Sequence, residues 1–146
     1  MEQAMDRTPA HLWLVGGLAT VWNAFGGYDY WMTKTENLEY LAQMGGDPRE
    51  LLAWIDGFPI WAQFGWGLGV WMGLLGSALL LIRSRWAVHA FGLSLIGAVL
   101  GLGYQMANPM PGVTGFMATG MPAIIIAIAV ALFLYARAQR ASGVLR

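Results

Sequence analysis

Four long apolar segments leave this chain few folds to choose from. They are predicted at residues 9–33, 59–82, 86–107 and 115–137. A helix over the first segment would rise ~37 Å at ~1.5 Å per residue, enough to cross a hydrocarbon core about 30 Å thick. The expected fold is therefore all-α: an integral membrane protein with an antiparallel four-helix bundle, and with residues 1–146 as a single membrane domain.

The composition points the same way and excludes several kinds of function. Hydrophobic residues make up 58% of the 146 residues and charged residues only 11%, against about 25% charged in an average soluble domain. The 8 basic and 8 acidic residues cancel, so the lipid bilayer, and no nucleic acid, is the expected partner. With no cysteine and two histidines, we expect no disulfide, no metal and no cofactor.

Residues 34–58 form a charged connector between the first two spans, with two basic and five acidic residues. Leu38 and Leu41 at a spacing of three predict one short helix, and residues 47–50 contain the capping aspartate, proline and glutamate of a second helix start. We expect two short amphipathic helices at the membrane interface. They would serve either as a solvated connector or as a lid over a site beneath them.

The basic residues predict the orientation. Lys and Arg near span ends gather on the cytoplasmic side of membrane proteins. The first segment carries Glu2 and Asp6 before it and no small-residue cleavage site, so we expect it to be retained as a helix. Both termini are then expected in the cytoplasm and the connector outside, because six basic residues share one end: Arg7, Arg83, Arg85, Arg137, Arg140 and Arg146.

A stripe of glycines along the second segment predicts close helix packing. Small residues let helix backbones approach one another in lipid, where no hydrophobic effect drives association. Whether the partner helix belongs to the same chain is open at this point, so a homo-oligomer or a larger membrane complex is a candidate partner. The glycines assigned to packing are Gly65, Gly69, Gly73 and Gly76 on the second segment, and Gly97 and Gly101 on the third.

Polar residues interrupt the apolar segments near the outward end. Leaving a polar group without a partner in an apolar medium costs roughly 2–7 kcal/mol, so a polar side chain at membrane depth is a functional-site hypothesis. Aromatic faces would stack on a small polyhydroxylated or polar ligand, and amides and carboxylates would bond its hydroxyls. The candidate ligand-binding residues are Trp22, Asn23, Asp29, Tyr30, Gln63, Trp66, Tyr104, Gln105 and Asn108.

A purely structural role accounts for the same residues, with the aromatic side chains as an interfacial belt and the amides pairing between helices. Other chemistries have weaker support. His11 and His89 lie at span ends, whereas a bis-imidazole haem needs them deeper in the bundle. Asp29 and Asp56 as an acid/base pair lack a nucleophile or phosphate loop. We therefore expect no enzyme activity.

Short motifs along most of the chain carry a resemblance to a known group. They are Thr8-Pro9-Ala10-His11-Leu12-Trp13, Trp22-Asn23, Gly26, Asp29-Tyr30-Trp31-Met32-Thr33 and Tyr135-Ala136-Arg137. With them the chain resembles small, uncharacterised proteobacterial four-helix membrane proteins, which often carry an automatic "sugar transporter" label. The resemblance implies the fold and a multi-pass place in the bacterial inner membrane. No functional residue is carried over from it.

Three functions from different classes remain. The first is a protein that binds or transports a small polar molecule at the outward-facing site. The second is a non-catalytic accessory subunit of a larger membrane complex, docked through the glycine stripe. The third is a membrane enzyme or haem carrier, for which the sequence offers least.

Overall fold

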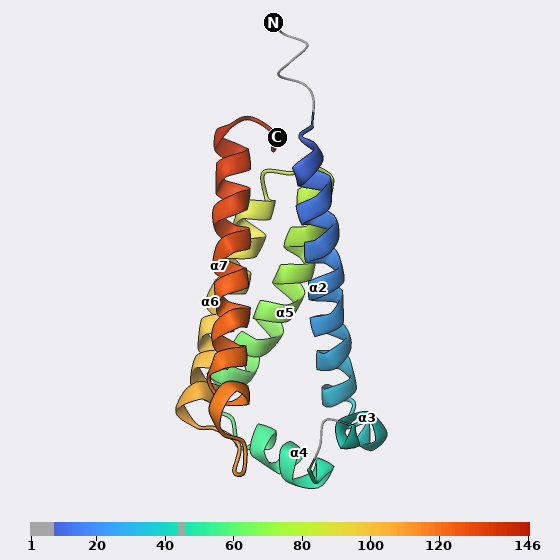
Figure 1. Cartoon of the computed structure of the whole chain (residues 1–146), viewed down its shortest axis with the longest axis vertical. Helices are drawn as coiled ribbons and strands as arrows, with labels where there is room; N and C mark the ends of the chain where they lie inside the picture. The colour runs from blue at the N-terminus through green and yellow to red at the C-terminus, as the bar shows by residue number, and fades with distance from the viewer. Residues whose placement is uncertain (1–7, 44–45) are drawn as a thin grey trace, which may run out of the picture.

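The computed structural model describes residues 8–43 and 46–146, and over that range it is all-helical without a strand (Figure 1). The all-α prediction is confirmed. Arg7 and the acidic residues before it lie outside the described range. Successive long helices run antiparallel, and α3 and α4 lie at the end opposite the termini. The elements are α2 (Ala10–Lys34), α3 (Leu38–Ala42), α4 (Pro48–Asp56), α5 (Ile60–Leu81), α6 (Ala87–Ala107), η1 (Gly115–Met117) and α7 (Gly120–Ala141).

The last helix differs most from its predicted bounds, since α7 covers 120–141 where the apolar segment predicted 115–137. Gly115 has a φ of 65° and Thr119 a φ of −128°, both outside the α-helical region, so residues 115–117 form a separate 3-10 turn before α7 begins. At the other end Gly143 has a φ of 80°. The amide of Val144 donates to the carbonyl of Gln139 at 2.9 Å and that of Gly143 to Arg140 at 3.1 Å, a Schellman ending that fixes where α7 stops.

The long helices form a curved row rather than a closed bundle. α2 packs on α5, α5 packs on α6, and α6 packs on α7. α2 and α7 meet at the end that holds the termini, where His11 Nδ1 and Tyr135 Oη lie 2.5 Å apart, and they diverge toward α3 and α4 (Figure 1). The described chain therefore has a gap between its first and last long helices, and side chains of both helices line it.

The glycines assigned to packing make their close contacts within this one chain, mainly where α5 crosses α6. A Cβ added to Gly97 would fall 2.5 Å from the carbonyl oxygen of Gly65, and one on Gly69 would fall 3.0 Å from the amide of Ala98. Gly101 faces the backbone of Trp66 in the same way. Two further glycines of α5 admit side chains instead: Gly73 admits Asn23 and Ser94, and Gly76 admits the ring of Phe91.

The buried core sits at the end of the molecule that holds the termini. Leu12 of α2, Leu80 of α5, Phe91 of α6 and Ala136 of α7 belong to one buried cluster, which Leu145 also joins. The last residues reach this cluster because they pair with the turn between α5 and α6. The amide of Arg146 donates to the carbonyl of Arg83 at 2.8 Å, and the amide of Arg85 donates to the carbonyl of Arg146 at 2.9 Å.

Three segments of the described chain are long and apolar enough to cross a membrane: Ile60–Leu81, Ala87–Ala107 and Gly115–Ala141. α2 is long enough, at 25 residues, but it is not among them, and it carries Asn23, Asp29 and Lys34. The composition and these three segments support a membrane protein.

The contact between α5 and α6 can be tested with two alanine substitutions in α6. Gly97→Ala should lower the free energy of unfolding by about 1–3 kcal/mol, because the new Cβ overlaps the backbone of α5. Gly103 has no neighbouring atom within 4 Å of an added Cβ, so Gly103→Ala should raise it by about 0.5–1 kcal/mol. Unfolding of both variants in the same detergent is the measurement, and equal effects would contradict the close backbone contact.

Candidate functional site

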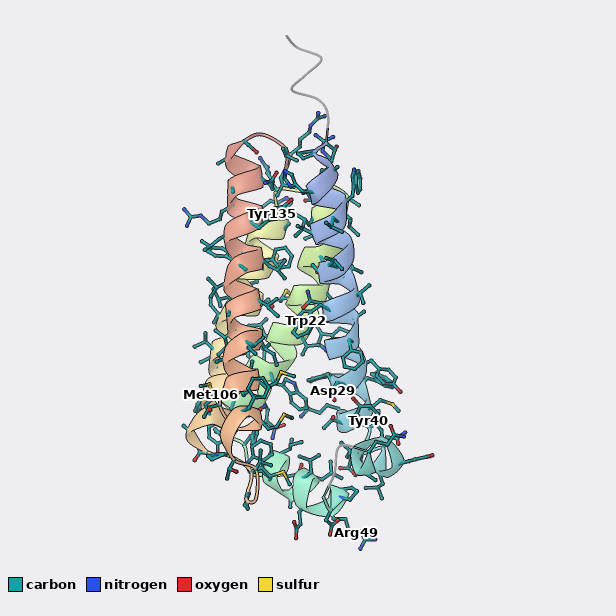
Figure 2. The ribbon with its side chains drawn as sticks, in the orientation of Figure 1. Trp22, Asp29, Tyr40, Arg49, Met106 and Tyr135 are labelled. Carbon is teal, nitrogen blue, oxygen red and sulfur yellow. The ribbon has the colours of Figure 1, made fainter. Side chains whose placement is uncertain are left out.

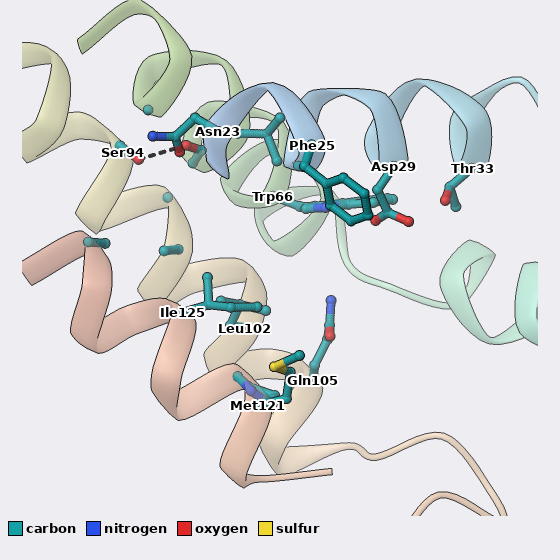
Figure 3. A pocket seen from close by; sticks show the side chains of 18 of the residues that line it. Asn23, Phe25, Asp29, Thr33, Trp66, Ser94, Leu102, Gln105, Met121 and Ile125 are labelled. Atoms are coloured by element: carbon teal, nitrogen blue, oxygen red, sulfur yellow. Dashed lines mark hydrogen bonds between the residues drawn. The ribbon is translucent and has the colours of Figure 1, made fainter. Parts of the chain in front are cut away.

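A cavity of about 690 Å³ lies between the four long helices at the end where α2 and α7 diverge, and side chains of α3 and α4 contribute to it. Figure 3 shows it from close by, with Asn23 and Asp29 on α2 and Gln105 reaching in from α6. Five residues predicted from the sequence line this cavity: Trp22, Asn23, Asp29, Trp66 and Gln105.

Tyr30 and Gln63 were also predicted to bind a ligand, but they lie behind the cavity wall. The Tyr30 ring packs against Trp66 with centroids 4.7 Å apart. Gln63 accepts a hydrogen bond from Lys34 Nζ at 2.7 Å, and the same ammonium lies 5.2 Å from the centroid of Trp66. These residues connect α2 to α5 and hold Trp66 in place, rather than facing the cavity.

Tyr104 and Asn108 were predicted to join the site from the end of α6, and they too lie outside the cavity lining. Tyr104 packs against Phe58 with centroids 4.8 Å apart and against Trp61 at 5.6 Å. The carbonyl of Asn108 accepts a hydrogen bond from Trp54 Nε1 at 3.1 Å. Both residues connect α4 and the start of α5 to α6, and α4 thereby covers that end of the cavity.

Asn23 belongs to a polar layer that crosses three helices. Its Nδ2 donates to the carbonyl of Ala19 at 2.9 Å and to Ser77 Oγ of α5 at 3.0 Å. The hydroxyl of Ser94 in α6 donates to the carbonyl of Gly69 at 2.6 Å. An added Cβ on Gly73 would meet both Asn23 Oδ1 and Ser94 Oγ. The layer therefore needs glycine at position 73, and Asn23 is partnered within the protein through its amide nitrogen.

Asp29 and Tyr40 form the second polar contact, at the end of the cavity near α3 (Figure 2). The Tyr40 hydroxyl donates to Asp29 Oδ1 at 2.7 Å, and both residues line the cavity. Burial raises the pKa of the Tyr40 phenol above its ordinary value of about 10, and the hydrogen bond to Asp29 raises it further. Tyr40 therefore stays protonated at physiological pH, and its hydroxyl donates a hydrogen bond to the carboxylate.

Sequence reasoning missed Tyr40, because its position depends on how α3 folds back. Asn37 caps α3 by accepting a hydrogen bond from the amide of Tyr40 at 2.9 Å, and Glu36 takes a φ of 55° in the turn after α2. An asparagine before a helix is a capping signal that a sequence shows. The left-handed turn at Glu36 cannot be predicted in this way, since a glutamate rarely adopts that backbone conformation. This turn directs α3 so that Tyr40 reaches Asp29.

The rest of the cavity wall is mostly apolar, and α7 supplies one side of it. Met121, Ile125 and Ile128 of α7 line it. A second apolar groove of about 450 Å³ continues between α2 and α7 and shares Trp22, Ile128 and Leu132 with the cavity. The site thus has a polar end near Asp29 and an apolar end that follows the gap between the first and last helices.

The other chemistries considered for the sequence have separate positions in the structure. His11 contacts Tyr135 and His89 packs against Trp86 with ring centroids 4.9 Å apart. Asp56 is exposed at the end of α4 and does not line the cavity with Asp29. Among the residues that the structure describes, no three His, Cys, Asp or Glu side chains gather where they could hold a metal ion.

Comparisons of the chain with family models, with curated proteins and with solved structures found no match.

The hydrogen bond between Tyr40 and Asp29 can be tested by its pH dependence. A raised pKa favours the protonated phenol in the folded state, so the stabilisation is complete below about pH 10 and is lost as the pH rises above it. Tyr40→Phe should lower the free energy of unfolding by about 1 kcal/mol at pH 8. The difference from the unmodified chain should shrink above pH 10.

Tyr28→Phe is the matched control, because Tyr28 is exposed and packs edge-on against the ring of Tyr40. It keeps that ring contact and should leave the stability nearly unchanged at both pH values. If Tyr40→Phe and Tyr28→Phe behave alike, the hydrogen bond between α3 and α2 does not stabilise the fold.

Proposed function

We propose that the chain is a four-span protein of the bacterial inner membrane that binds or transports a small molecule in the cavity between α2 and α7. The observation that carries this proposal is the shape and lining of the cavity. It is large enough for a small ligand, at about 690 Å³, and it combines a few polar groups with a mostly apolar wall, as ligand sites usually do.

An exposed apolar stripe on α2 supports counting it as a fourth span. Leu14, Leu18 and Val21 recur at helical spacing and are each 63–70% exposed. Leu18 and Val21 border the open groove between α2 and α7, where lipid would reach them. Trp13 and Trp31 are exposed toward the two ends of this helix, and aromatic residues at both interfaces are typical of membrane spans. Asn23 and Asp29 line the cavity. These polar residues, which make α2 less apolar than the other long helices, therefore need not face lipid.

The orientation follows from the basic residues. Arg83 and Arg85 in the turn after α5, Arg137 and Arg140 near the end of α7, and Arg146 belong to the end of the molecule that holds the termini. The positive-inside rule then places both termini in the cytoplasm. The cavity end near Asp29 and the connector helices α3 and α4 face outward.

An accessory subunit is the alternative function, and a homo-oligomer or a larger complex would be its partner. The glycine stripe gives it less support than the sequence suggested, because α2 and α6 cover that face of α5 within the chain. A docking partner would need another surface. The cavity, in contrast, is lined by residues of all four long helices and of both connector helices. A binding function therefore accounts for more of the structure.

Cysteine labelling tests the cavity and the orientation together, since the chain has no cysteine of its own. Met121 lines the cavity, whereas Ile124, one turn further along α7, does not, although the two side chains are similarly exposed at 38% and 42%. A membrane-impermeant maleimide added to intact cells should label Met121→Cys and leave Ile124→Cys unlabelled, because a thiol in lipid does not ionise.

Equal labelling of the two variants would contradict a water-accessible cavity. Labelling of Met121→Cys only in inverted vesicles would contradict the proposed orientation. A membrane extraction with alkaline carbonate should leave both variants in the pellet, as expected for a multi-span protein.

A further inference from the structure

The charge of the cavity wall is one-sided. Asp29 is the only carboxylate among the described residues that line it, and no Lys, Arg or His side chain lines it. Only one oxygen of Asp29 accepts a hydrogen bond from a described residue, the one bonded to Tyr40. Gln105 adds an amide that also lines the cavity and that has no hydrogen-bond partner in the described part of the protein. The lining therefore favours a positively charged group, while the amides of Gln43 and Gln105 can both donate and accept hydrogen bonds.

Aromatic side chains surround the carboxylate. Trp22, Phe25, Trp54 and Trp66 line the same cavity as Asp29 and Tyr40, and Figure 3 shows Phe25 and Trp66 beside Asp29. The faces of such rings attract cations, and recognition of ammonium groups by aromatic cages depends on this attraction. Lys34 Nζ already lies 5.2 Å from the Trp66 ring, but it is held by Gln63 outside the lining.

The apolar part of the site fits a hydrocarbon group. Ile125, Ile128 and Leu132 of α7 continue from the cavity into the groove between α2 and α7. That groove is lined by apolar residues throughout. α2 and α7 are not packed along this stretch, so a molecule dissolved in the bilayer can reach the cavity sideways between the two helices.

We propose that the site takes a lipophilic cation: an ammonium or similar head group beside Asp29 and the aromatic rings, with its apolar part in the groove between α2 and α7. This inference rests on the proposed binding function and names its ligand class. The ligand enters from the lipid side rather than from water, because its apolar part partitions into the bilayer first.

The same wall argues against the polyhydroxylated ligand that the sequence suggested. A sugar needs a hydrogen-bond partner for most of its hydroxyls, whereas polar side chains are a minority of this wall and three of them already donate to protein atoms. Asn23 Nδ2, the Ser94 hydroxyl and the Tyr40 hydroxyl already donate to protein atoms. An anion would meet the Asp29 carboxylate without any cationic side chain in the lining to offset it.

A matched pair of ions tests the proposal. Tetraphenylphosphonium and tetraphenylborate have nearly the same size and shape and opposite charge. Binding of each, radiolabelled, is measured to the full chain in nanodiscs of zwitterionic phosphatidylcholine, with empty nanodiscs as the blank. The cation should bind saturably and the anion should not. Dodecyltrimethylammonium should displace the cation, since it offers an ammonium head and a hydrocarbon chain.

Variants connect the binding to Asp29. Asp29→Asn should weaken cation binding roughly tenfold or more through loss of the charge, while Asp29→Glu should keep most of it. Asp56→Asn is the control, because this carboxylate is exposed on α4 and outside the cavity. Elution as a single monodisperse species on gel filtration checks that each variant is folded.

Each result decides between the two proposals. Saturable binding of the anion, or equal cation binding by Asp29→Asn and Asp56→Asn, would overturn the cationic ligand. If Met121→Cys is labelled while tetraphenylphosphonium does not bind, the cavity stands and the ligand class fails. If Met121→Cys is not labelled from either side, the proposed function fails first.

Discussion

The contact between the backbones of α5 and α6 determines how the other helices are placed. Glycines at positions 65, 69, 97 and 101 let these two helices touch main chain to main chain, which side chains at those positions would prevent. α2 then packs on the free side of α5 and α7 on the free side of α6. A tight central pair with one helix on each flank produces a row, and the gap between the flanking helices is the cavity.

The polar residues of α2 are compatible with this arrangement because they face inward. Asn23 occupies the space that Gly73 leaves and bonds to Ser77, and Asp29 bonds to Tyr40. The exposed large side chains of α2 include Leu14, Leu18 and Val21. α2 therefore has a polar side and an apolar side. Gly73 is as necessary to the polar layer as the side chains that form it, because it makes room for Asn23 and Ser94.

The sequence predicted the helices well and the site only in part, for physical reasons. Long apolar segments and the cap at Asp47 are local signals, so three long helices and α4 appear where they were expected. The sequence gives the position of a polar residue along a predicted span. It does not show which face of the helix turns toward the site. Tyr104 and Gln105 are neighbours in sequence, yet Tyr104 packs on Phe58 while Gln105 lines the cavity.

The residues that the sequence did not identify depend on tertiary contacts. Tyr40 reaches Asp29 only because of the left-handed turn at Glu36. The α7 side chains became part of the wall because α7 stands apart from α2 over most of its length. No periodicity in residues 124–134 distinguishes a helix that faces a cavity from one that faces lipid on all sides.

The docking of the last residues onto the turn between α5 and α6 has a mechanical consequence for α7. Hydrogen bonds among Arg83, Arg85 and Arg146, together with buried Leu145, pin the end of this helix. Ala136 joins the same buried cluster, whereas toward Met121 the helix packs on α6 and not on α2. A change in the width of the gap would therefore require α7 to move against α6 about this pinned end.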